Sequence, residues 1–373
     1  MMWWLVAVPL FALMMTLFNV LFWPRTSTSP GETSSSRVSV LIPARNEERN
    51  IATSVRAALH ATPPVFEVIV YDDGSTDRTP DILAALQQQD DRLRVVQGVA
   101  LPTGWVGKVH ACAQLSRHAR GDILLFVDAD VCLEPKGLVQ IHALMDDYQA
   151  KILTAVPRQE TGSMVERLVL PLLHLTYTSW LPQPLVWLTS HPALLSANGQ
   201  ILCMRPETLD SIGGFEAIRT EVVDDMALCR RAKQHGQRVL FADGHHIARC
   251  RMYHSAHEVW EGFSKNIYRG LGANPAALMF VLMLYFTAFI LPYIALVASV
   301  WMPHLWGPAA TAVGINLALR LVLLLRHGHP AVSVLLHPLG VGMLLMIAVN
   351  SLRWHVMGRV RWAGRVYASG ASK

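Results

Sequence analysis

The chain has 373 residues, and its 32 basic and 27 acidic side chains leave a formal net charge of +5 at pH 7. Apolar residues make up 52% of it and charged residues only 16%, whereas about a quarter of the residues in an average globular domain are charged. This composition excludes a disordered chain, because so much apolar surface is not left in water. The five cysteines show no CxxC or Cys/His zinc spacing, so we expect neither a disulfide framework nor a structural metal site. The middle of the chain has no basic helix or aromatic-basic strip, so we expect no nucleic-acid partner.

The first segment, residues 1–23, is apolar apart from Thr16 and Asn19, and a linker rich in Ser, Thr, Pro and Gly follows over 24–36. A membrane-spanning helix needs about 20 such residues. A cleaved signal peptide is the alternative, but no Lys or Arg precedes the apolar run and no Ala-x-Ala site closes it. We therefore expect residues 1–23 to be an N-terminal transmembrane anchor.

Residues 37–274 are predicted to form an α/β domain with a mostly parallel sheet. Short β-branched runs alternate with helical stretches, at 38–42, 48–60, 66–71, 79–89 and 123–127. That alternation is typical of parallel strands joined by crossover helices. An open parallel sheet binds its ligands at the carboxyl ends of its strands, and polar residues follow each of these runs. Within the domain, the apolar stretch 168–188 is broken by three prolines, so we expect it to lie on a membrane surface.

Apolar segments return over 275–350, at 276–302, 305–325 and 331–350, and a basic tail follows at 351–373. The third segment contains His337-Pro338, which favours a re-entrant or interfacial segment. The positive-inside rule places ends rich in Lys and Arg in the cytoplasm. Two groups of basic residues bear on this rule: Arg25 and Arg37 after the anchor, and five basic residues in the tail. Both groups lie in the cytoplasm if only two of the three apolar segments cross the membrane. We therefore expect a multi-pass protein of the cell (inner) membrane with a cytoplasmic α/β domain.

Polar motifs follow the first two strands of the predicted sheet. The first strand leads into Pro43-Ala44-Arg45-Asn46-Glu47, and the second into Asp72-Asp73-Gly74-Ser75-Thr76-Asp77. Acidic side chains at these places can accept hydrogen bonds from the imide N–H or the ribose hydroxyls of a nucleoside. An Asp-Gly turn capped by Ser75 or Thr76 is the structural alternative.

A third motif, Asp128-Ala129-Asp130, ends the third strand. Residues i and i+2 of a strand share one face, so both carboxylates can converge on one point. Their repulsion is relieved by a hard divalent cation such as Mg²⁺ or Mn²⁺, which would in turn hold a diphosphate. A solvated strand end is the alternative.

Two further motifs supply a lysine and a second acidic pair. Gly104-Trp105-Val106-Gly107-Lys108 places one lysine near the expected phosphates without the spacing of a P-loop. Asp224-Asp225 introduces a helical stretch. One of these carboxylates either caps that helix or serves as a general base near a bound diphosphate.

In this order the motifs resemble the family 2 glycosyltransferases of GT-A fold, in particular the membrane-anchored, lipid-modifying members. The resemblance covers about residues 37–270. Three stretches look most like bacterial carotenoid- and hopanoid-associated glycosyltransferases: Gly104–Lys108, Arg251-Met252-Tyr253 and Gly262-Phe263-Ser264-Lys265-Asn266.

The resemblance implies a nucleoside site made by four residues: Pro43, Ala44, Glu47 and Asp73. It also implies that Asp128 binds ribose or metal, that Asp130 binds the metal, that Lys108 contacts nucleotide or phosphate, and that Asp225 is the catalytic base. The implied activity is metal-dependent, inverting transfer of a sugar. The donor would be a nucleotide-sugar, expected to be a UDP-sugar with Mg²⁺ or Mn²⁺, and the acceptor a membrane lipid such as a carotenoid or hopanoid.

One departure from the family pattern bears on the acceptor. Processive polysaccharide synthases and ceramide glucosyltransferases carry Gln/Arg-x-x-Arg-Trp after the catalytic Asp, whereas the comparable region here is 262–266, Gly-Phe-Ser-Lys-Asn. This difference argues against chain polymerisation and a ceramide acceptor. A polysaccharide synthase and a nucleotidyltransferase of related fold remain alternatives. A non-enzymatic transporter or scaffold is disfavoured, because transport sites place ionisable residues in the membrane and the expected spans contain only Arg320 and His337.

Overall fold

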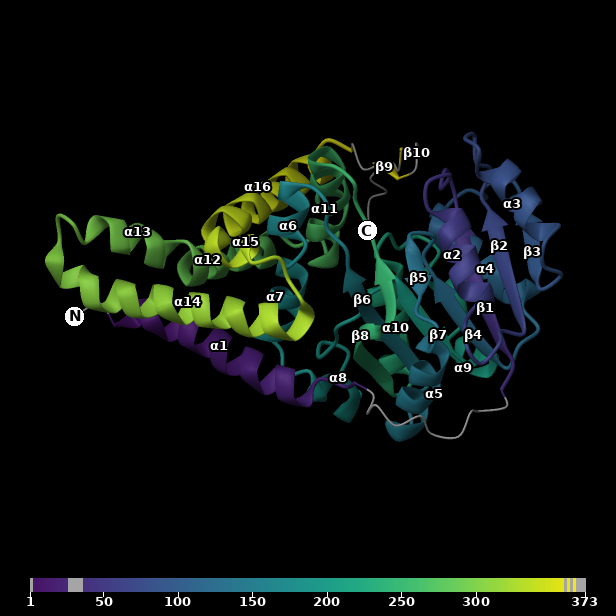
Figure 1. The fold of residues 1–373 in the computed structure, drawn as a ribbon, viewed down its shortest axis with the longest axis horizontal. Helices are drawn as coiled ribbons and strands as arrows, with labels where there is room; N and C mark the ends of the chain where they lie inside the picture. Colours follow the sequence, from purple (N-terminus) through teal and green to yellow (C-terminus); the bar gives the residue numbers. More distant parts are fainter. Residues whose placement is uncertain (1–2, 26–35, 359–360, 363–364, 367–373) are drawn as a thin grey trace. The chain divides into compact units, whose positions relative to one another are not determined.

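The computed structural model describes residues 3–25, 36–358, 361–362 and 365–366, and the chain divides into two compact units. The α/β unit consists of Trp23–Glu160 and Pro184–Met252. The helical unit consists of Met1–Phe22, Thr161–Gln183 and Tyr253–Lys373. This division differs from the expected single block 37–274, because the chain leaves the α/β unit at Thr161, forms two helices of the other unit and returns at Pro184 (Figure 1).

The α/β unit contains an eight-stranded sheet with the strand order β3-β2-β1-β4-β7-β6-β8-β5. The strands are β1 (Val38–Ala44), β2 (Glu67–Asp72), β3 (Leu93–Gln97), β4 (Ile123–Val127), β5 (Val131–Leu133), β6 (Ile152–Gln159), β7 (Ile201–Met204) and β8 (Val239–Cys250). Neighbouring strands are parallel except where β7 or β5 is a partner. The predicted mostly parallel sheet is confirmed.

The helices of this unit are α2 (Ile51–Leu59), α3 (Thr79–Gln87), α4 (Gly107–His118), α5 (Gly137–Asp147), α8 (Pro184–Leu188), α9 (Pro206–Ser211) and α10 (Asp224–Gln234), with a 3₁₀ turn at Phe215–Ile218. The runs predicted as strands are β1, β2 and β4, and the first two helical stretches are α2 and α3. All residues of β2 and β4 are buried, as expected for strands of a sheet covered on both faces.

The antiparallel strand β7 determines which chain segments meet at the ligand-binding edge. It runs against both β4 and β6. Its first residue therefore lies at the same edge as the last residues of β1, β2, β4, β6 and β8. Residues 43–44, 72–73, 128–130, 159, 200 and 250 are gathered there, although up to two hundred positions separate them in the chain.

A buried carboxylate joins the strands at the opposite edge, where β1 and β2 begin. Glu67 is 5% exposed. It accepts hydrogen bonds from Ser39 Oγ (2.7 Å), the backbone N–H of Arg120 (2.7 Å) and Arg94 Nη1 (2.8 Å). Burial by itself raises the pKa of Glu67, but these hydrogen bonds outweigh it and hold the pKa below its ordinary value.

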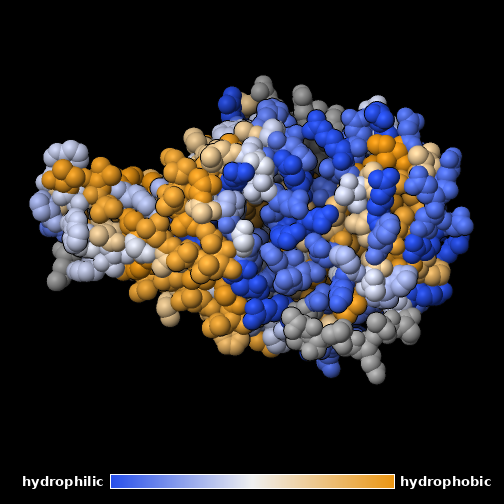
Figure 2. Space-filling view, viewed as in Figure 1, coloured by the Kyte–Doolittle hydropathy of each residue, from blue (hydrophilic) through white to orange (hydrophobic). Residues whose placement is uncertain are grey.

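The helical unit contains α1 (Trp4–Phe22), α6 (Met164–Val169), α7 (Leu172–Ser179), α11 (Ala256–Gly270), α12 (Pro275–Phe289), α13 (Leu291–Ala298), α14 (Trp306–His327), α15 (Val332–Leu335) and α16 (His337–Val356), a 3₁₀ turn at Pro303–Leu305, and two short paired strands, β9 (Arg361–Trp362) and β10 (Arg365–Val366). Three helical segments are long and apolar enough to cross a membrane: Trp4–Phe22, Pro303–His327 and His337–Val356. Together α11 and α12 pass the same test, but they are bent by 118°. Figure 2 shows apolar side chains covering much of the surface of these helices. Phe11, Phe280 and Leu321 are among the large apolar side chains that are exposed.

Two of the expected membrane segments differ from the observed helices. The segment 276–302 is divided at Ile290 into α12 and α13. Pro292 lies in the first turn of α13, where it has no N–H to continue the preceding helix. In 331–350 the expected break lies just before His337, and α16 continues from there to Val356 as one helix. Most of the linker 24–36 and of the tail after 358 lies outside the described residues.

The stretch 168–188 is partly buried inside the helical unit, and its expected position on a membrane surface stays a prediction. Leu168, Leu172 and Leu175 are buried within the helical unit, where α7 packs against α1 and α6 against α16. Polar groups strengthen this packing. Asn19 of α1 donates to the carbonyls of Thr178 (2.7 Å) and Leu181 (2.8 Å). Hydrogen bonds of this kind join helices in apolar surroundings.

We predict that Glu67→Gln lowers the stability of the protein at pH 7 by about 1–3 kcal/mol, because a charge-assisted acceptor is lost from a buried site. The pKa of Glu67 is lowered in the folded state, so its stabilisation is complete above the ordinary glutamate pKa of about 4.3 and is lost as the pH falls through the lower folded value. The difference in unfolding midpoint between variant and wild type, measured in detergent, should therefore shrink in acid. Glu207→Gln, at an exposed position, is the control; an equal effect of both variants at pH 7 would contradict the prediction.

Candidate functional site

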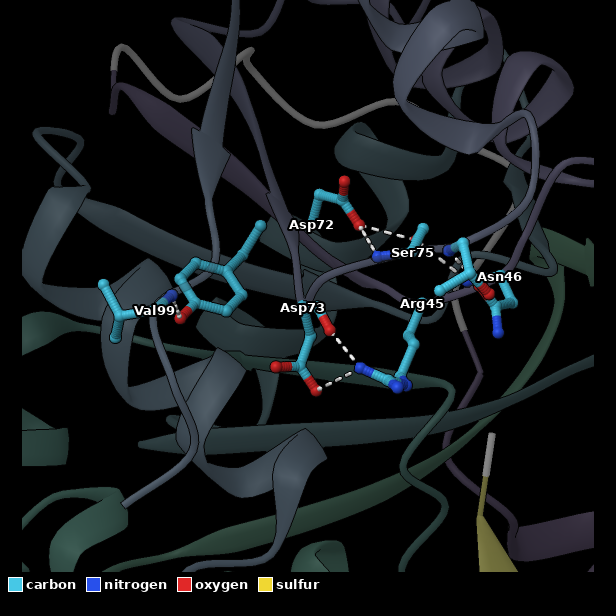
Figure 3. A network of polar contacts seen from close by, with 8 residues as sticks. Arg45, Asn46, Asp72, Asp73, Ser75 and Val99 are labelled. Carbon is cyan, nitrogen blue, oxygen red and sulfur yellow. Dashed lines mark hydrogen bonds and ion pairs between the residues drawn. The ribbon is translucent and has the colours of Figure 1, made fainter. Parts of the chain in front are cut away.

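The first part of the site is the loop pair that follows β1 and β2 (Figure 3). Ala44 lies opposite Asp72 in the sheet, and its carbonyl accepts the backbone N–H of Asp73 (2.9 Å). The two loops are also tied by side chains. Asn46 Oδ1 accepts the N–H of Thr76 (2.8 Å), and Ser75 Oγ accepts the N–H of Asn46 (2.9 Å). These bonds keep the residues after Pro43 and Ala44 in a fixed position.

The two neighbouring aspartates of the second loop have different roles. Asp72 Oδ1 accepts from both the N–H (2.9 Å) and the hydroxyl (2.6 Å) of Ser75, so Asp72 forms the turn. Asp73 is 1% exposed, with Oδ2 3.9 Å from Arg45 Nη1, and Arg45 also donates to the Asp73 carbonyl. The turn interpretation of the Asp-Asp motif is thus confirmed for Asp72, and nucleoside binding by Asp73 stays a prediction.

A glycine at the end of β3 allows close contact with these aspartates. Gly98 donates its N–H to the carbonyl of Asp72 (2.7 Å). A Cβ at this position would lie 2.5 Å from that carbonyl oxygen and 2.9 Å from the Cα of Asp73. Any other residue would therefore push β3 away from the loop.

The second part of the site is organised around Lys108, in the first turn of α4. Its Nζ lies 2.7 Å from Asp128 Oδ1 and 3.8 Å from Asp224 Oδ2. All three side chains are largely shielded, with exposed fractions of 21% for Lys108, 27% for Asp128 and 12% for Asp224. Burial alone lowers the pKa of Lys108, but the two carboxylates outweigh it and raise the pKa well above its ordinary value. Lys108 is therefore a permanent cation.

One lysine does not neutralise the acidic groups around it. Burial and the nearby Asp128 charge raise the pKa of Asp130 to about 7. Burial also raises the pKa of Glu47 to about 7, with smaller contributions from Asp130 and Asp128. Glu47, which the sequence assigns to the nucleoside site, is therefore also coupled electrostatically to the Asp128-Ala129-Asp130 motif. Three carboxylates share one region of low polarity.

Asp225 lies in the first turn of α10, behind Asp224. Its Oδ1 accepts the N–H of Met226 (2.7 Å). Burial and the neighbouring Asp224 charge raise the pKa of Asp225 to about 6. Gly199 brings another loop against this carboxylate, because a Cβ at Gly199 would lie 3.3 Å from the Cβ of Asp225 and 3.4 Å from Nζ of Lys108. A carboxylate with this pKa is ionised at neutral pH and can accept a proton.

The residues at the end of β4 fit a divalent cation whose coordination is completed by a bound substrate. Oδ1 of Asp130 is buried and has no hydrogen-bond partner among the described residues, which is the state expected of a carboxylate oxygen that awaits a cation. In the part of the chain that the structure describes, no three His, Cys, Asp or Glu side chains are placed to hold a metal ion by themselves. Mg²⁺ is held in such sites by one or two carboxylates together with substrate phosphates and water.

Some residues of the site were not identified from the sequence. The sequence predicts no role for Arg45 and only a helix-capping role for Asp224, whereas Arg45 holds Asp73 and Asp224 faces Lys108. Cys250 was counted only as a cysteine, yet it lies beside Asp130. The available signal was positional, because Arg45 and Asp224 each adjoin a predicted site residue. For Cys250 the position at the end of β8 was not recognised.

The family model of glycosyl transferase family 2 matches residues 39–225, which is half of the chain. Of the residues assigned to the site above, Cys250 lies outside this range. The 4,4'-diaponeurosporenoate glycosyltransferase of Staphylococcus aureus (strain MRSA252) is 26% identical over 340 residues, covering 89% of this chain and 88% of the relative. The enzyme of the same name from strain USA300 gives the same identity and coverage.

A solved structure shows the same fold. The mannosyltransferase PcManGT from Pyrobaculum calidifontis, in complex with GDP-Man and Mn²⁺, superimposes with a TM-score of 0.59 at 18% identity, over 93% of this chain and 95% of that one. The match extends over both units, and the α/β unit has the GT-A fold expected from the sequence. The chain therefore belongs to glycosyltransferase family 2 and is a glycosyltransferase.

Proposed function

We propose that the protein transfers a sugar from a nucleotide-diphosphate donor to a lipid held in the membrane, with inversion at the anomeric carbon. The observation that supports this proposal most strongly is the convergence of Lys108, Asp128, Asp130 and Asp225 at one edge of the sheet. This set contains a cation for phosphate, a carboxylate pair for a metal and a base for the acceptor.

The donor would be bound by the two parts of the site. Pro43, Ala44 and the buried Asp73 would hold the nucleoside, with Arg45 fixing the Asp73 carboxylate. Lys108 would contact the diphosphate, because its ammonium group lies 2.7 Å from Asp128, which would hold the metal. That the nucleoside is uridine is a prediction from the resemblance.

Asp128 and Asp130 would hold Mg²⁺ or Mn²⁺ together with the diphosphate. When bound there, the ion would stabilise the negative charge that develops on the leaving diphosphate. The buried, unpartnered Oδ1 of Asp130 supports this assignment. PcManGT, which has the same fold as this chain, was solved in complex with Mn²⁺.

Asp225 would act as the general base. It would remove the proton from an acceptor hydroxyl or carboxyl group as the oxygen attacks the anomeric carbon. One base and one direct displacement invert the configuration, so an α-linked donor gives a β-linked product. Asp224 stays paired with Lys108 and is not the base in this scheme.

The acceptor would be an isoprenoid lipid such as a carotenoid or hopanoid. Three helices of the helical unit can cross a membrane, and their exposed apolar side chains suit contact with lipid. The Staphylococcus aureus relatives are named for a carotenoid acceptor. We propose in addition that the α/β unit faces the cytoplasm, where nucleotide-sugars are made, in accord with the basic residues that flank the first and last helices.

We predict that Asp225→Asn reduces sugar transfer at least about 100-fold, the usual contribution of a general base, while the affinity for UDP changes little. Transfer is measured as labelled sugar entering extracted lipid, and UDP affinity by calorimetry. Glu221→Gln, an exposed change four positions earlier, is the control. A parallel loss of UDP binding in Asp225→Asn would reassign Asp225 to donor binding.

We predict that Lys108→Met weakens UDP binding about tenfold or more, because a partly buried cation that faces the diphosphate is removed. Lys108→Arg should recover part of the affinity, since it keeps the charge with a different geometry. Lys136→Met, which removes an exposed lysine of the same unit, should leave the affinity unchanged. UDP affinity equal to wild type in Lys108→Met would refute the phosphate-binding role.

We predict that kcat/KM falls below about pH 6, because the base must be ionised and the pKa of Asp225 is raised to about 6 by burial and by Asp224. Asp224→Asn removes the neighbouring negative charge, so it should lower the pKa of Asp225 and move the acidic limb to lower pH. A pH profile of each variant gives the comparison. An acidic limb that moves to higher pH in Asp224→Asn would contradict this electrostatic account.

A further inference from the structure

Three side chains from different strands form a hydrogen-bonded chain beside the carboxylate pair. Gln159 ends β6, Gln200 precedes β7, and Cys250 ends β8. Gln159 Nε2 donates to Gln200 Oε1 (2.9 Å), and Gln200 Nε2 donates to Cys250 Sγ (2.8 Å). Gln159 and Cys250 are paired across the sheet, so the positions are set by strand register.

The direction of this chain is fixed at its first residue. Gln159 Nε2 also lies 3.1 Å from the carbonyl of Pro157, and a carbonyl only accepts hydrogen bonds. Gln159 must therefore offer N–H to Gln200, and Gln200 must offer N–H to the sulfur of Cys250. The sulfur is used as an acceptor, and its own proton is the one donor left at the end of the chain.

The group that this proton can reach is the carboxylate of Asp130. Cys250 is 1% exposed, and its thiol and the Asp130 carboxylate interact. Residue 250 lies opposite Val131 in the β5–β8 pair, one position beyond Asp130. Asp130 Oδ1 has no hydrogen-bond partner among the described residues, so the thiol leaves that oxygen available.

We propose that Cys250 is a positioning residue, whose thiol donates to the Asp130 carboxylate and directs its free oxygen toward the divalent cation. This inference rests on the proposed metal site. The two aspartates of the pair then differ. Asp128 is paired with the cation of Lys108, whereas the donor to Asp130 is neutral and leaves its Oδ1 without a hydrogen-bond partner among the described residues. That oxygen of Asp130 would therefore be the one most available to the metal.

The chemistry of the thiol suits this task. A lysine or arginine beside Asp130 would neutralise the charge that the cation needs, and an apolar side chain would leave the carboxylate free to rotate. Partners that orient a metal ligand through a hydrogen bond commonly contribute a factor of about 10 to 100 in metal affinity. In this arrangement the hydrogen bond from Gln200 Nε2 to the sulfur would hold the thiol in the orientation that faces Asp130.

The test is Mn²⁺ affinity of the full-length protein in detergent with UDP present, measured by the electron paramagnetic resonance of free Mn²⁺. Cys250→Ala should bind Mn²⁺ about tenfold more weakly or worse, and Cys250→Ser, which keeps a donor, should recover most of the affinity. Cys250→Val fills the space without a donor and should behave as Cys250→Ala, which covers the case in which the alanine variant does not fold. Cys203→Ala is the matched control, because Cys203 is a fully buried cysteine of β7 that contacts Met145.

The outcomes separate the inference from the function on which it rests. Affinity that is unchanged in Cys250→Ala and Cys250→Val, or equally weak in Cys250→Ser, would overturn the positioning role. If wild type binds no Mn²⁺, or if Asp130→Asn binds it as well as wild type does, the proposed metal site fails and the inference fails with it. Weak binding in Cys250→Ala and Cys250→Val, recovery in Cys250→Ser and no change in Cys203→Ala would support the inference.

Discussion

The mutual repulsion of buried carboxylates at one edge of the sheet is the constraint on which the site depends. Asp128, Asp130 and Asp224 surround a single lysine, Lys108, and gathering such charges away from water is costly unless they are paired. Lys108 compensates two of them. The remaining negative charge raises the pKa values of Asp130 and Asp225, and this is the electrostatic basis of the cation site and the general base that we propose.

The sheet topology produces this arrangement. Parallel strands bring the ends of β1, β2 and β4 to one edge, and the reversed strand β7 adds the loop before it to the same place. That loop contains Gly199 and Gln200. Gly199 lets the loop lie close to both Asp225 and Lys108, and Gln200 uses its backbone carbonyl to accept the N–H of Asp128 (3.2 Å) while its side-chain amide reaches Cys250. A single short loop thus contacts both Asp225 and the carboxylate pair.

Local patterns predicted much of the fold and part of the site. The strands β1, β2 and β4 are short apolar runs, and polar residues that follow such runs in a parallel sheet must share an edge, so the neighbourhood of Asp73 and Asp128 was predictable. The register between strands that lie far apart in the sequence was not predictable. The chain from Gln159 through Gln200 to Cys250 depends on pairing between segments about ninety residues apart, and no local pattern contains that information. The contacts of Thr178 and Ser179 are not contained in any local pattern for the same reason, because their partners Asn19 and Thr16 lie more than 150 residues away.

The central claim is that this edge of the sheet transfers a sugar from a nucleotide to a lipid. The most direct measurement is a donor screen, in which purified protein in detergent is incubated with radiolabelled UDP- and GDP-sugars, Mn²⁺ and a total bacterial lipid extract, and the organic and aqueous phases are then separated. The account predicts that label from one donor moves into the organic phase and that a nucleoside diphosphate is released in equal amount. Release of pyrophosphate, growth of a polymer from donor alone, or no turnover of any donor would contradict it.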